Sequence, residues 1–321
     1  MAVAHGVAAL GYNSMTAMSE QTPSADRSHL LTEQRLPESM KIDALPIAEG
    51  VQIMLEQDRR AVEAVAAQKQ AVTRAVEIVA ACLKSGGRLI YVGAGTSGRL
   101  GVLDASECPP TFRSEPDMVQ GIIAGGDAAM FRAQEGAEDS ADGGANAIED
   151  KSVSSKDVVM GIAAGGTTPF VHGALRRARD RGAKTIFLTC IAPFADEPEV
   201  DLVIRPLTGP EVITGSTRLK AGTATKLVLN MITTLVMVQL GKVYENLMVD
   251  LRATNSKLRD RAARIVATLT DLPREQAFEW VDKAAGHVKV AVVMVKRNLP
   301  AEEARALLAK TGGKLRAALE K

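Results

Sequence analysis

The stretch Leu89–Gly101 constrains this chain most, because it predicts a strand, a tight loop and a helix in direct succession. The apolar run Leu89–Val92 leads into glycines and hydroxyls, and the spacing of Leu100 and Leu103 predicts a helix opening at Ser97 or Gly98. Unpaired backbone N–H groups and the positive end of a helix dipole bind anions at such a loop, most often phosphate. The candidate phosphate-binding residues here are Gly95, Thr96, Ser97 and Gly98.

The same loop matches the G-x-G-x-x-G pattern of dinucleotide-binding folds, through Gly93, Gly95 and Gly98. That pattern requires an acidic residue at the end of the next strand, about 20 residues further on. The acid that follows the next predicted strand is Asp127, 29 positions beyond Gly98 and behind a Gly-Gly pair. The spacing therefore disfavours a nicotinamide or flavin cofactor. It favours a small phosphorylated ligand held by backbone and hydroxyl groups together.

Apolar runs alternate with helical stretches through the middle of the chain. Runs rich in valine and isoleucine, without polar alternation, are typical of strands buried on both faces. We therefore expect an α/β fold with a largely parallel sheet and helices on each side, and a functional site at the carboxyl ends of the strands. The predicted strands are Arg88–Val92, Val119–Ala124, Asp157–Ala163, Lys184–Thr189 and Asp201–Arg205.

Helices are predicted on either side of this region. Apolar residues at three- and four-residue steps predict one long helix or two between Ile47 and Leu83. The most apolar helical run, Leu227–Leu240, is shorter than the ~20 residues that a membrane span needs and contains several polar side chains. We expect it to be a buried core helix, and we expect no membrane association.

Two further loops repeat the combination of glycine and hydroxyl side chains. Gly165–Pro169 follows the third predicted strand, and Thr214–Lys220 comes after the fifth. Three such loops at strand ends of one sheet predict a polyol phosphate ligand, with these additional binding candidates: Gly166, Thr167, Thr168, Ser216, Thr217 and Lys220. A simpler interpretation stays open, in which Pro169 only opens a helix. On that interpretation Thr217 is an ordinary helix cap and Lys220 a solvated helix charge.

Composition excludes several classes of function. With 321 residues, 46% hydrophobic and 24% charged, the chain is typical of a soluble protein with one large domain and a smaller one. A net charge of +1 and 3% aromatic residues, without a basic stripe, predict no nucleic-acid partner. Three widely spaced cysteines favour free thiols in a reducing compartment, and four scattered histidines predict no metal centre. Residues 1–28 show no signal peptide and are expected to be a disordered tail.

Two acidic segments accompany these loops. Asp104–Phe112 places Glu107 next to Cys108, and its Pro-Pro pair predicts an irregular, rigid connection. The second segment, Gln134–Ser140, places Glu138 among three acids around a glycine. Read alone, these acids are expected to be solvated surface and cap residues. Cys108 is disfavoured as a nucleophile, because no histidine near it in the sequence would lower its pKa.

The run Tyr91–Thr111 resembles the signature of the N-acetylmuramic acid 6-phosphate etherases, which belong to the sugar isomerase (SIS) superfamily. The likeness covers roughly residues 30 to 320 and includes the blocks Thr32–Arg35, Glu135–Asp139, Val212–Ala224, Leu227–Met231 and Asn246–Asp250. It implies a three-layer α/β/α sandwich over residues 29–256, N-terminal helices included. It also implies a small helical module over residues 257–321, similar to ubiquitin-associated domains.

The resemblance implies a cofactor-independent lyase that converts N-acetylmuramic acid 6-phosphate into N-acetylglucosamine 6-phosphate and D-lactate. Opening the sugar ring exposes an aldehyde that acidifies the C2 hydrogen, so that lactate is eliminated from C3 and water then adds. Two carboxyl groups with separated pKa values suffice for this chemistry. The family's acids match Glu107, expected to protonate the leaving lactate, and Glu138, expected to handle the C2 proton or activate water. The resemblance also implies a cytoplasmic homodimer whose sites borrow residues from the neighbour.

One loop and one segment depart from simple expectation. Many relatives read Ala-Ser-Gly-Arg-Thr-Pro where this chain has Gly165 and Thr167, which removes a serine hydroxyl and an arginine charge; Thr167 or backbone N–H groups are expected to compensate. Val288–Lys296 predicts a strand by its β-branched residues but a helix by the resemblance, and we follow the resemblance. Two other functions stay open: a sugar-phosphate isomerase, which would release no lactate, and a non-catalytic sugar-phosphate sensor similar to the glucokinase regulatory protein.

Overall fold

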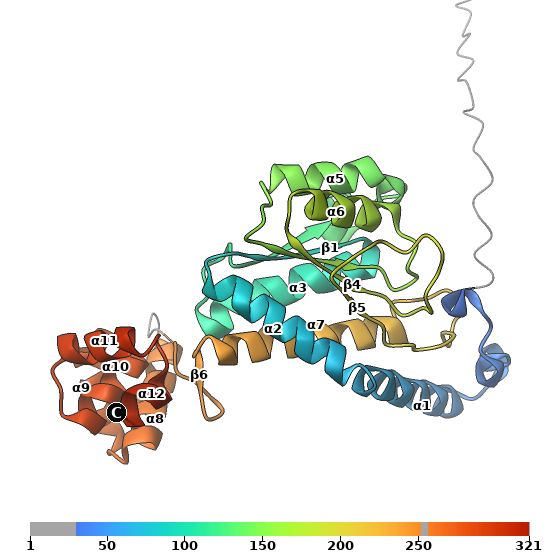
Figure 1. The fold of residues 1–321 in the computed structure, drawn as a ribbon. Coiled ribbons are helices and arrows are strands. Elements are labelled where there is room, and N and C mark those ends of the chain that lie inside the picture. Colours follow the sequence, from blue (N-terminus) through green and yellow to red (C-terminus); the bar gives the residue numbers. More distant parts are fainter. Residues whose placement is uncertain (1–29, 252–255, 321) are drawn as a thin grey trace, which may run out of the picture.

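The structure is a computed structural model that describes residues 30–251 and 256–320; the tail predicted over residues 1–28 lies outside this part. At its centre lies a sheet in the order β2-β1-β3-β4-β5, in which all neighbouring strands are parallel (Figure 1). The strands are β1 (Leu89–Gly93), β2 (Val119–Ile123), β3 (Val158–Ile162), β4 (Lys184–Leu188) and β5 (Leu202–Ile204). The five predicted strands and their parallel arrangement are confirmed.

Helices cover both faces of this sheet, which confirms the three layers (Figure 1). One face carries α5 (Ala141–Asp150) and α6 (Pro169–Asp180), and the other carries α2 (Lys69–Lys84), α3 (Gly95–Phe112) and α7 (Lys220–Gln239). Side chains of β1 alternate between the layers. Ile90 and Val92 pack in the core with α6, whereas Leu89 and Tyr91 pack in the core with α2 and α7. Burial on both faces explains the continuous apolar runs of the sequence.

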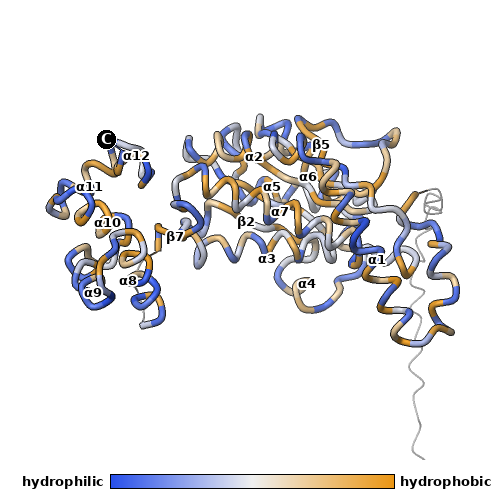
Figure 2. The backbone as a smooth tube through the Cα atoms, turned by 90° about the horizontal axis from the view of Figure 1, so that it is seen from below, coloured by the Kyte–Doolittle hydropathy of each residue, from blue (hydrophilic) through white to orange (hydrophobic). Residues whose placement is uncertain are grey.

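The helical pattern between Ile47 and Leu83 is two helices, α1 (Ile47–Ala66) and α2, separated by a break at Ala67 and Gln68. Three short 3-10 turns precede them: η1 (Leu31–Glu33), η2 (Pro37–Ser39) and η3 (Ile42–Ala44). Helix α1 projects beyond the sheet (Figure 1) and carries hydrophobic positions along its length (Figure 2). Several of these are exposed, among them Ile47, Val51 and Leu55.

Helix α3 differs from prediction at both ends. It begins at Gly95, earlier than the glycine and leucine spacing indicates. It also continues through Pro109 and Pro110 to Phe112, so the prediction of an irregular connection there is wrong. The two prolines remove N–H groups only from the last turn, while the helix buries Ala105 and Cys108 in the core. Packing therefore outweighs the lost hydrogen bonds.

Helix α7 is the core helix expected from its composition. By length and hydropathy alone it is long and apolar enough to cross a membrane, but 56% of its apolar window is buried inside the fold. Val228, Ile232 and Val236 are fully or almost fully buried against the sheet and its neighbouring helices. This burial is what a core helix of a folded domain requires.

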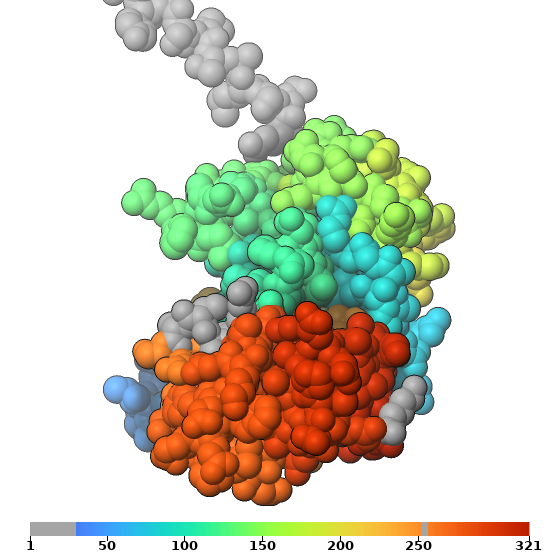
Figure 3. Space-filling view, turned by 90° about the vertical axis from the view of Figure 1, so that its left-hand side faces the viewer, coloured from blue at the N-terminus to red at the C-terminus, as the bar shows by residue number. Residues whose placement is uncertain are grey.

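The C-terminal part forms a separate lobe, coloured orange to red in Figure 3, with a hydrophobic core of its own. It contains α8 (Ser256–Thr270), α9 (Arg274–Lys283), α10 (Val288–Arg297), α11 (Ala301–Lys310) and α12 (Leu315–Glu320). The segment Val288–Arg297 is a helix, so the prediction from β-branching is wrong and the one from the resemblance is confirmed. Its valines are buried among the neighbouring helices, and this packing overrides their β-propensity.

A short connection joins this lobe to the α/β domain. It holds the hairpin of β6 (Val243–Tyr244) and β7 (Leu247–Met248). After the hairpin, Asp250 pairs with Lys242 at 2.6 Å and with Lys289 of α10 at 3.0 Å, so one carboxylate links the end of α7 to the lobe. The remaining elements, α4 (Ala128–Phe131) and η4 (Ala137–Asp139), lie between β2 and α5.

Candidate functional site

The order of the strands locates a crevice at the carboxyl edge of the sheet. The chain leaves β1 toward β2 on one side and returns to β3 on the other, so the order reverses between β1 and β3. Gly93 of β1 is level with Ile162 of β3, and the loops that lead to α3 and α6 leave from these neighbouring ends. Ligands of open α/β sheets bind in such a crevice. The first two predicted loops therefore lie side by side where a ligand is expected.

The N-terminus of α3 offers unpaired donors to this crevice. Within the described chain, the N–H groups of Gly95, Thr96 and Ser97 have no hydrogen-bond partner, whereas the N–H of Gly98 donates to the Ala94 carbonyl. The strand and the helix approach so closely that a Cβ on Gly98 would lie 2.7 Å from the Gly93 carbonyl oxygen. Thr96 and Ser97 are half-buried, so their hydroxyls can still reach a ligand. This geometry matches an anion site at a helix N-terminus.

The loop before α6 provides a second set of donors. Its residues Thr167 and Thr168 are half-buried, and neither N–H has a partner in the part of the chain that the structure covers. Pro169 is the first residue of α6, as expected of a helix entry. Gly166 adopts a φ of +78°, and its carbonyl lies 2.6 Å from Nε2 of His172.

The loop before α7 is different, because a buried carboxylate occupies its helix N-terminus. Oε2 and Oε1 of Glu211 accept the N–H groups of Lys220 and Ala221, each at 3.0 Å. The Lys220 ammonium is buried too and donates to Oε1 of Gln57 at 2.7 Å, so Lys220 is not the solvated charge of the simpler interpretation. Burial raises the pKa of Glu211 and lowers the pKa of Lys220. A phosphate contact by Lys220 stays a prediction that its burial does not favour.

Contacts nevertheless gather the three loops at one place. A Cβ on Gly222 of α7 would lie 3.6 Å from the Thr96 side chain. Ser216 and Thr217, which precede α7, are half-buried at the same edge. The N-terminal turn joins them, since the N–H of Gly215 donates to the Thr32 carbonyl at 3.0 Å.

The two predicted acids lie on different elements, and Glu107 is well separated from the donors at the start of α3. Glu107 is on α3, nine residues after Gly98 and thus about 13 Å further along the helix axis. Glu138 is in η4, between β2 and α5. Both side chains are exposed, and across residues 30–251 and 256–320 neither makes a hydrogen bond or ion pair. The structure therefore leaves both carboxylates open to a ligand without bringing them into contact.

A buried acid of α3 escaped the sequence interpretation. Oδ1 of Asp104 accepts a hydrogen bond from Asn230 at 2.8 Å and one from Thr233 at 3.2 Å, both on α7, and Oδ2 accepts one from the Tyr91 hydroxyl at 2.9 Å. Burial raises the pKa of Asp104, although these hydrogen bonds act in the opposite direction. The network ties β1, α3 and α7 together beneath the site. Its only signal in the sequence is an acid on the apolar face of a helix.

The three thiols carry no chemistry at this site. Cys82, Cys108 and Cys190 are free and buried. Burial raises the pKa of Cys108 to about 12, which favours the protonated thiol over the thiolate. Among the residues that the structure describes, no three His, Cys, Asp or Glu side chains gather in a way that could hold a metal ion.

Comparisons with known proteins add to this geometry. A family model described as glucokinase regulatory protein N-terminal SIS domain matches residues 71–179. The N-acetylmuramic acid 6-phosphate etherase of Synechocystis sp. is 52% identical over 295 residues, which is 92% of this chain and 97% of the relative. That of Gloeobacter violaceus is 52% identical over 304 residues, 95% of this chain and 99% of the relative. Among solved structures, a phosphoheptose isomerase from Francisella tularensis is 18% identical and covers 60% of this chain and 100% of its own, with a TM-score of 0.46.

Proposed function

The chain belongs to the family of N-acetylmuramic acid 6-phosphate etherases, and from this premise we propose how its own residues carry out the reaction. The enzyme is a carbon–oxygen lyase that cleaves the D-lactyl ether of N-acetylmuramic acid 6-phosphate. Its products are N-acetylglucosamine 6-phosphate and D-lactate. The observation that carries our proposal is the pair of helix N-termini, α3 and α6, whose unpaired N–H groups meet at the switch point of the sheet.

These N-termini hold the 6-phosphate of the substrate. Gly95, Thr96 and Ser97 supply the donors of α3, and Thr167 and Thr168 supply those of the α6 loop. Gly98 and Gly166 already donate their N–H groups to Ala94 and Ala163, and they contribute by allowing the close packing of the backbone that shapes the two loops. Ser216 and Thr217 lie at the same edge and bind through their hydroxyls, because Glu211 already occupies the N–H groups of α7. A phosphate on aligned N–H groups gains from both hydrogen bonding and the helix dipole.

The two glutamates carry the proton transfers. In the open-chain sugar, one carboxylate removes the C2 proton, and the electron pair forms the C2–C3 double bond as the C3–O bond to lactate breaks. Glu107 protonates the departing lactate oxygen. Glu138 takes the C2 proton. When water then adds at C3, Glu107, now a carboxylate, takes a proton from the water and Glu138 returns a proton to C2, so both side chains end in their starting states. Both side chains are exposed and have no hydrogen bond or ion pair within the described residues, which supports these roles.

A homodimer would complete this site. In the substrate, five bonds separate the phosphorus from C3. This distance is shorter than the roughly 13 Å along α3 that separates Gly98 from Glu107. A Glu107 supplied by the partner subunit removes this mismatch. Exposed apolar residues of α1 and an apolar groove of about 850 Å³ between α2 and α7 support such an interface.

The three buried free thiols support a cytoplasmic location.

The test is release of D-lactate from N-acetylmuramic acid 6-phosphate by the purified protein and its Glu107→Gln and Glu138→Gln variants. We expect each substitution to lower kcat by roughly 10²–10⁴-fold, the usual contribution of a general acid or base. Glu135→Gln, in the same exposed segment as Glu138, is the matched control and should keep wild-type activity. A wild-type protein that binds the sugar phosphate without releasing lactate would instead support an isomerase or a sensor.

A further inference from the structure

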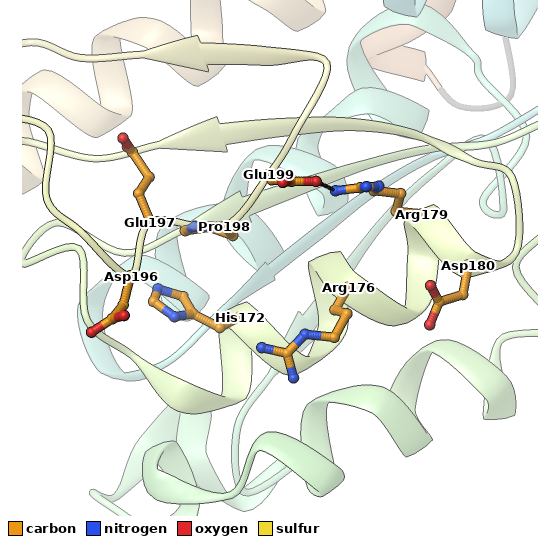
Figure 4. A pocket seen from close by; sticks show the side chains of 8 residues that line it. All are labelled: His172, Arg176, Arg179, Asp180, Asp196, Glu197, Pro198 and Glu199. Atoms are coloured by element: carbon orange, nitrogen blue, oxygen red, sulfur yellow. Dashed lines mark hydrogen bonds and ion pairs between the residues drawn. The ribbon is translucent and has the colours of Figure 1, made fainter.

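One histidine connects the α6 loop to a charged pocket behind it. His172 lies in the first turn of α6, and its Nε2 is 2.6 Å from the Gly166 carbonyl oxygen. Its ring stacks on Phe194 with centroids 6.2 Å apart and meets Phe187 edge-on at 6.0 Å. The other side of the ring faces a cavity of about 450 Å³, in which Arg176 and Asp196 are its neighbours (Figure 4). The ring therefore has both a fixed orientation and a defined hydrogen-bond acceptor.

The acceptor belongs to a glycine that no larger residue could replace without a clash. Gly166 has a φ of +78°, which glycine adopts without strain. A Cβ at this position would lie 2.4 Å from the Ile191 side chain and 3.0 Å from the Phe194 ring. Phe194 thus packs on both Gly166 and His172. Glycine at this position allows the peptide plane between Gly166 and Thr167 to adopt more than one direction.

Hydrogen bonding to His172 determines the direction of that plane. In a planar trans peptide the C=O and the following N–H point in opposite directions. A Gly166 carbonyl directed at His172 therefore directs the Thr167 N–H away from it, and this N–H has no partner within the described residues. Because Gly165 and Gly166 have no side chains, the loop depends on backbone N–H donors to bind a ligand. The direction of the Thr167 N–H therefore matters for binding.

We propose that His172 is a positioning residue, which holds the Gly166–Thr167 peptide so that the Thr167 N–H faces the substrate phosphate. The proposal rests on the proposed function of the loop. Nε2 must carry the hydrogen, since a carbonyl only accepts. Burial lowers the pKa of His172, although the hydrogen bond to Gly166 opposes this, and the ring is therefore neutral at neutral pH.

The charged groups around the ring do not replace this hydrogen bond. Arg176 follows on α6, and Asp196 and Glu197 lie in the segment after β4 that lines the same cavity. Glu197 pairs with Arg205, and Figure 4 shows its carboxylate pointing away from the ring. Protonation of His172 would keep Nε2–H as a donor, so the hydrogen bond exists in both charge states.

Two substitutions separate the hydrogen bond from the packing of the ring. His172→Phe keeps an aromatic ring between Phe187 and Phe194 but has no donor. His172→Gln loses the ring but keeps an N–H donor near Nε2. We expect His172→Phe to raise KM for N-acetylmuramic acid 6-phosphate about tenfold with kcat nearly unchanged, because a phosphate contact is kept from ground state to transition state. We expect His172→Gln to stay within about threefold of wild type.

Inorganic phosphate provides a readout that needs no turnover. Its dissociation constant, measured by calorimetry on the full chain, should rise by the same factor in His172→Phe and should not change in Arg176→Gln, which alters the same pocket without touching the loop. Nitrogen-15 spectra of labelled histidine should show the hydrogen on Nε2 of His172. If Gln is impaired and Phe is not, or if the hydrogen is on Nδ1, the positioning role is overturned. A wild-type protein that releases no lactate would overturn the proposed function, while the phosphate titration would still test His172.

Discussion

Helices α3 and α7 begin side by side at one edge of the sheet, after loops of similar composition, yet their N-termini differ. The first N–H groups of α3 have no partner in the described chain, whereas Glu211 accepts those of Lys220 and Ala221. A helix N-terminus binds an anion only if no anion from the protein already occupies it. The comparison teaches that glycines and hydroxyls identify a candidate anion site, but a distant carboxylate decides whether the site is open.

The two helix N-termini also differ in solvent exposure. Thr96 and Ser97 are half-buried at the mouth of the crevice, while Glu211 and Lys220 are almost completely inaccessible. A buried carboxylate costs much desolvation energy unless hydrogen bonds and an opposite charge compensate it. Glu211 has both, since two N–H groups and the charge of Lys220 surround it. The start of α7 is thus part of the scaffold, whereas the start of α3 is open to a ligand, as the proposed phosphate site requires.

The largest effect should come from breaking the cap of α7. Glu211→Gln removes a charge beside the buried Lys220 and turns an NH₂ group toward a backbone N–H that needs an acceptor. We expect a loss of about 3 kcal/mol in the free energy of unfolding, measured by urea denaturation at neutral pH. Glu49→Gln, an exposed acid in the first turn of α1, is the control and should cost less than about 0.5 kcal/mol. Equal losses in both would refute the structural role of Glu211.

A smaller effect, and one on binding rather than stability, should follow at α3. Ser97→Ala removes a hydroxyl donor from the open N-terminus, and we expect KM for the sugar phosphate to rise about tenfold while the urea midpoint stays the same. Thr217→Val changes the corresponding hydroxyl before α7 and should raise KM only about twofold, since the N–H groups beside it are already capped. Steady-state kinetics of lactate release compares the two. A larger effect of Thr217→Val would mean that the α7 loop is the main phosphate site.

The same contrast shows which features the sequence can predict. The strand, loop and helix at Leu89–Gly101 follow from short-range chemistry: apolar runs, a close approach that only glycine allows, and unpaired N–H groups. The sheet follows from the repetition of that pattern. The cap of α7 does not, because Glu211 lies nine residues before Lys220, in irregular chain that has no periodicity. From the sequence alone, a lysine at the start of a helix is predicted to be exposed to solvent. Only the fold shows that Lys220 is buried.

The two acids that we propose as catalytic illustrate a second limit. Glu107 and Glu138 are exposed, and within the described chain their side chains make no hydrogen bond or ion pair, so nothing in the local pattern distinguishes them from other surface acids. Only the resemblance pointed to them. Asp104 shows the reverse case, because its partners on α7 are more than 120 positions away in sequence. Its burial is a property of the tertiary structure that the sequence does not encode locally.

The smallest predicted effect is a difference in pH dependence between the wild-type protein and Glu211→Gln. Burial raises the pKa of Glu211 in the folded state above its ordinary value of 4.5, so the folded protein binds the proton more tightly than the unfolded chain does. Folding stability from this group is therefore highest below pH 4.5 and falls as the pH rises through the folded-state pKa. The variant lacks the group, and the titrations of groups distant from Glu211 cancel between the two proteins. Lys220 is coupled to Glu211, so the comparison is made at pH values well below the ordinary pKa of lysine.

We therefore expect the stability advantage of the wild-type protein over Glu211→Gln to shrink as the pH rises from about 4.5. Urea unfolding of both proteins at closely spaced pH values measures it, and the Glu49→Gln control should track the wild type throughout. An advantage that grows with pH would mean that the N–H groups and Lys220 outweigh burial, and that the folded-state pKa of Glu211 is lowered. In that case the N-terminus of α7 would favour an anion as strongly as that of α3 does. The two helices would then differ only in that Glu211 already occupies the N-terminus of α7.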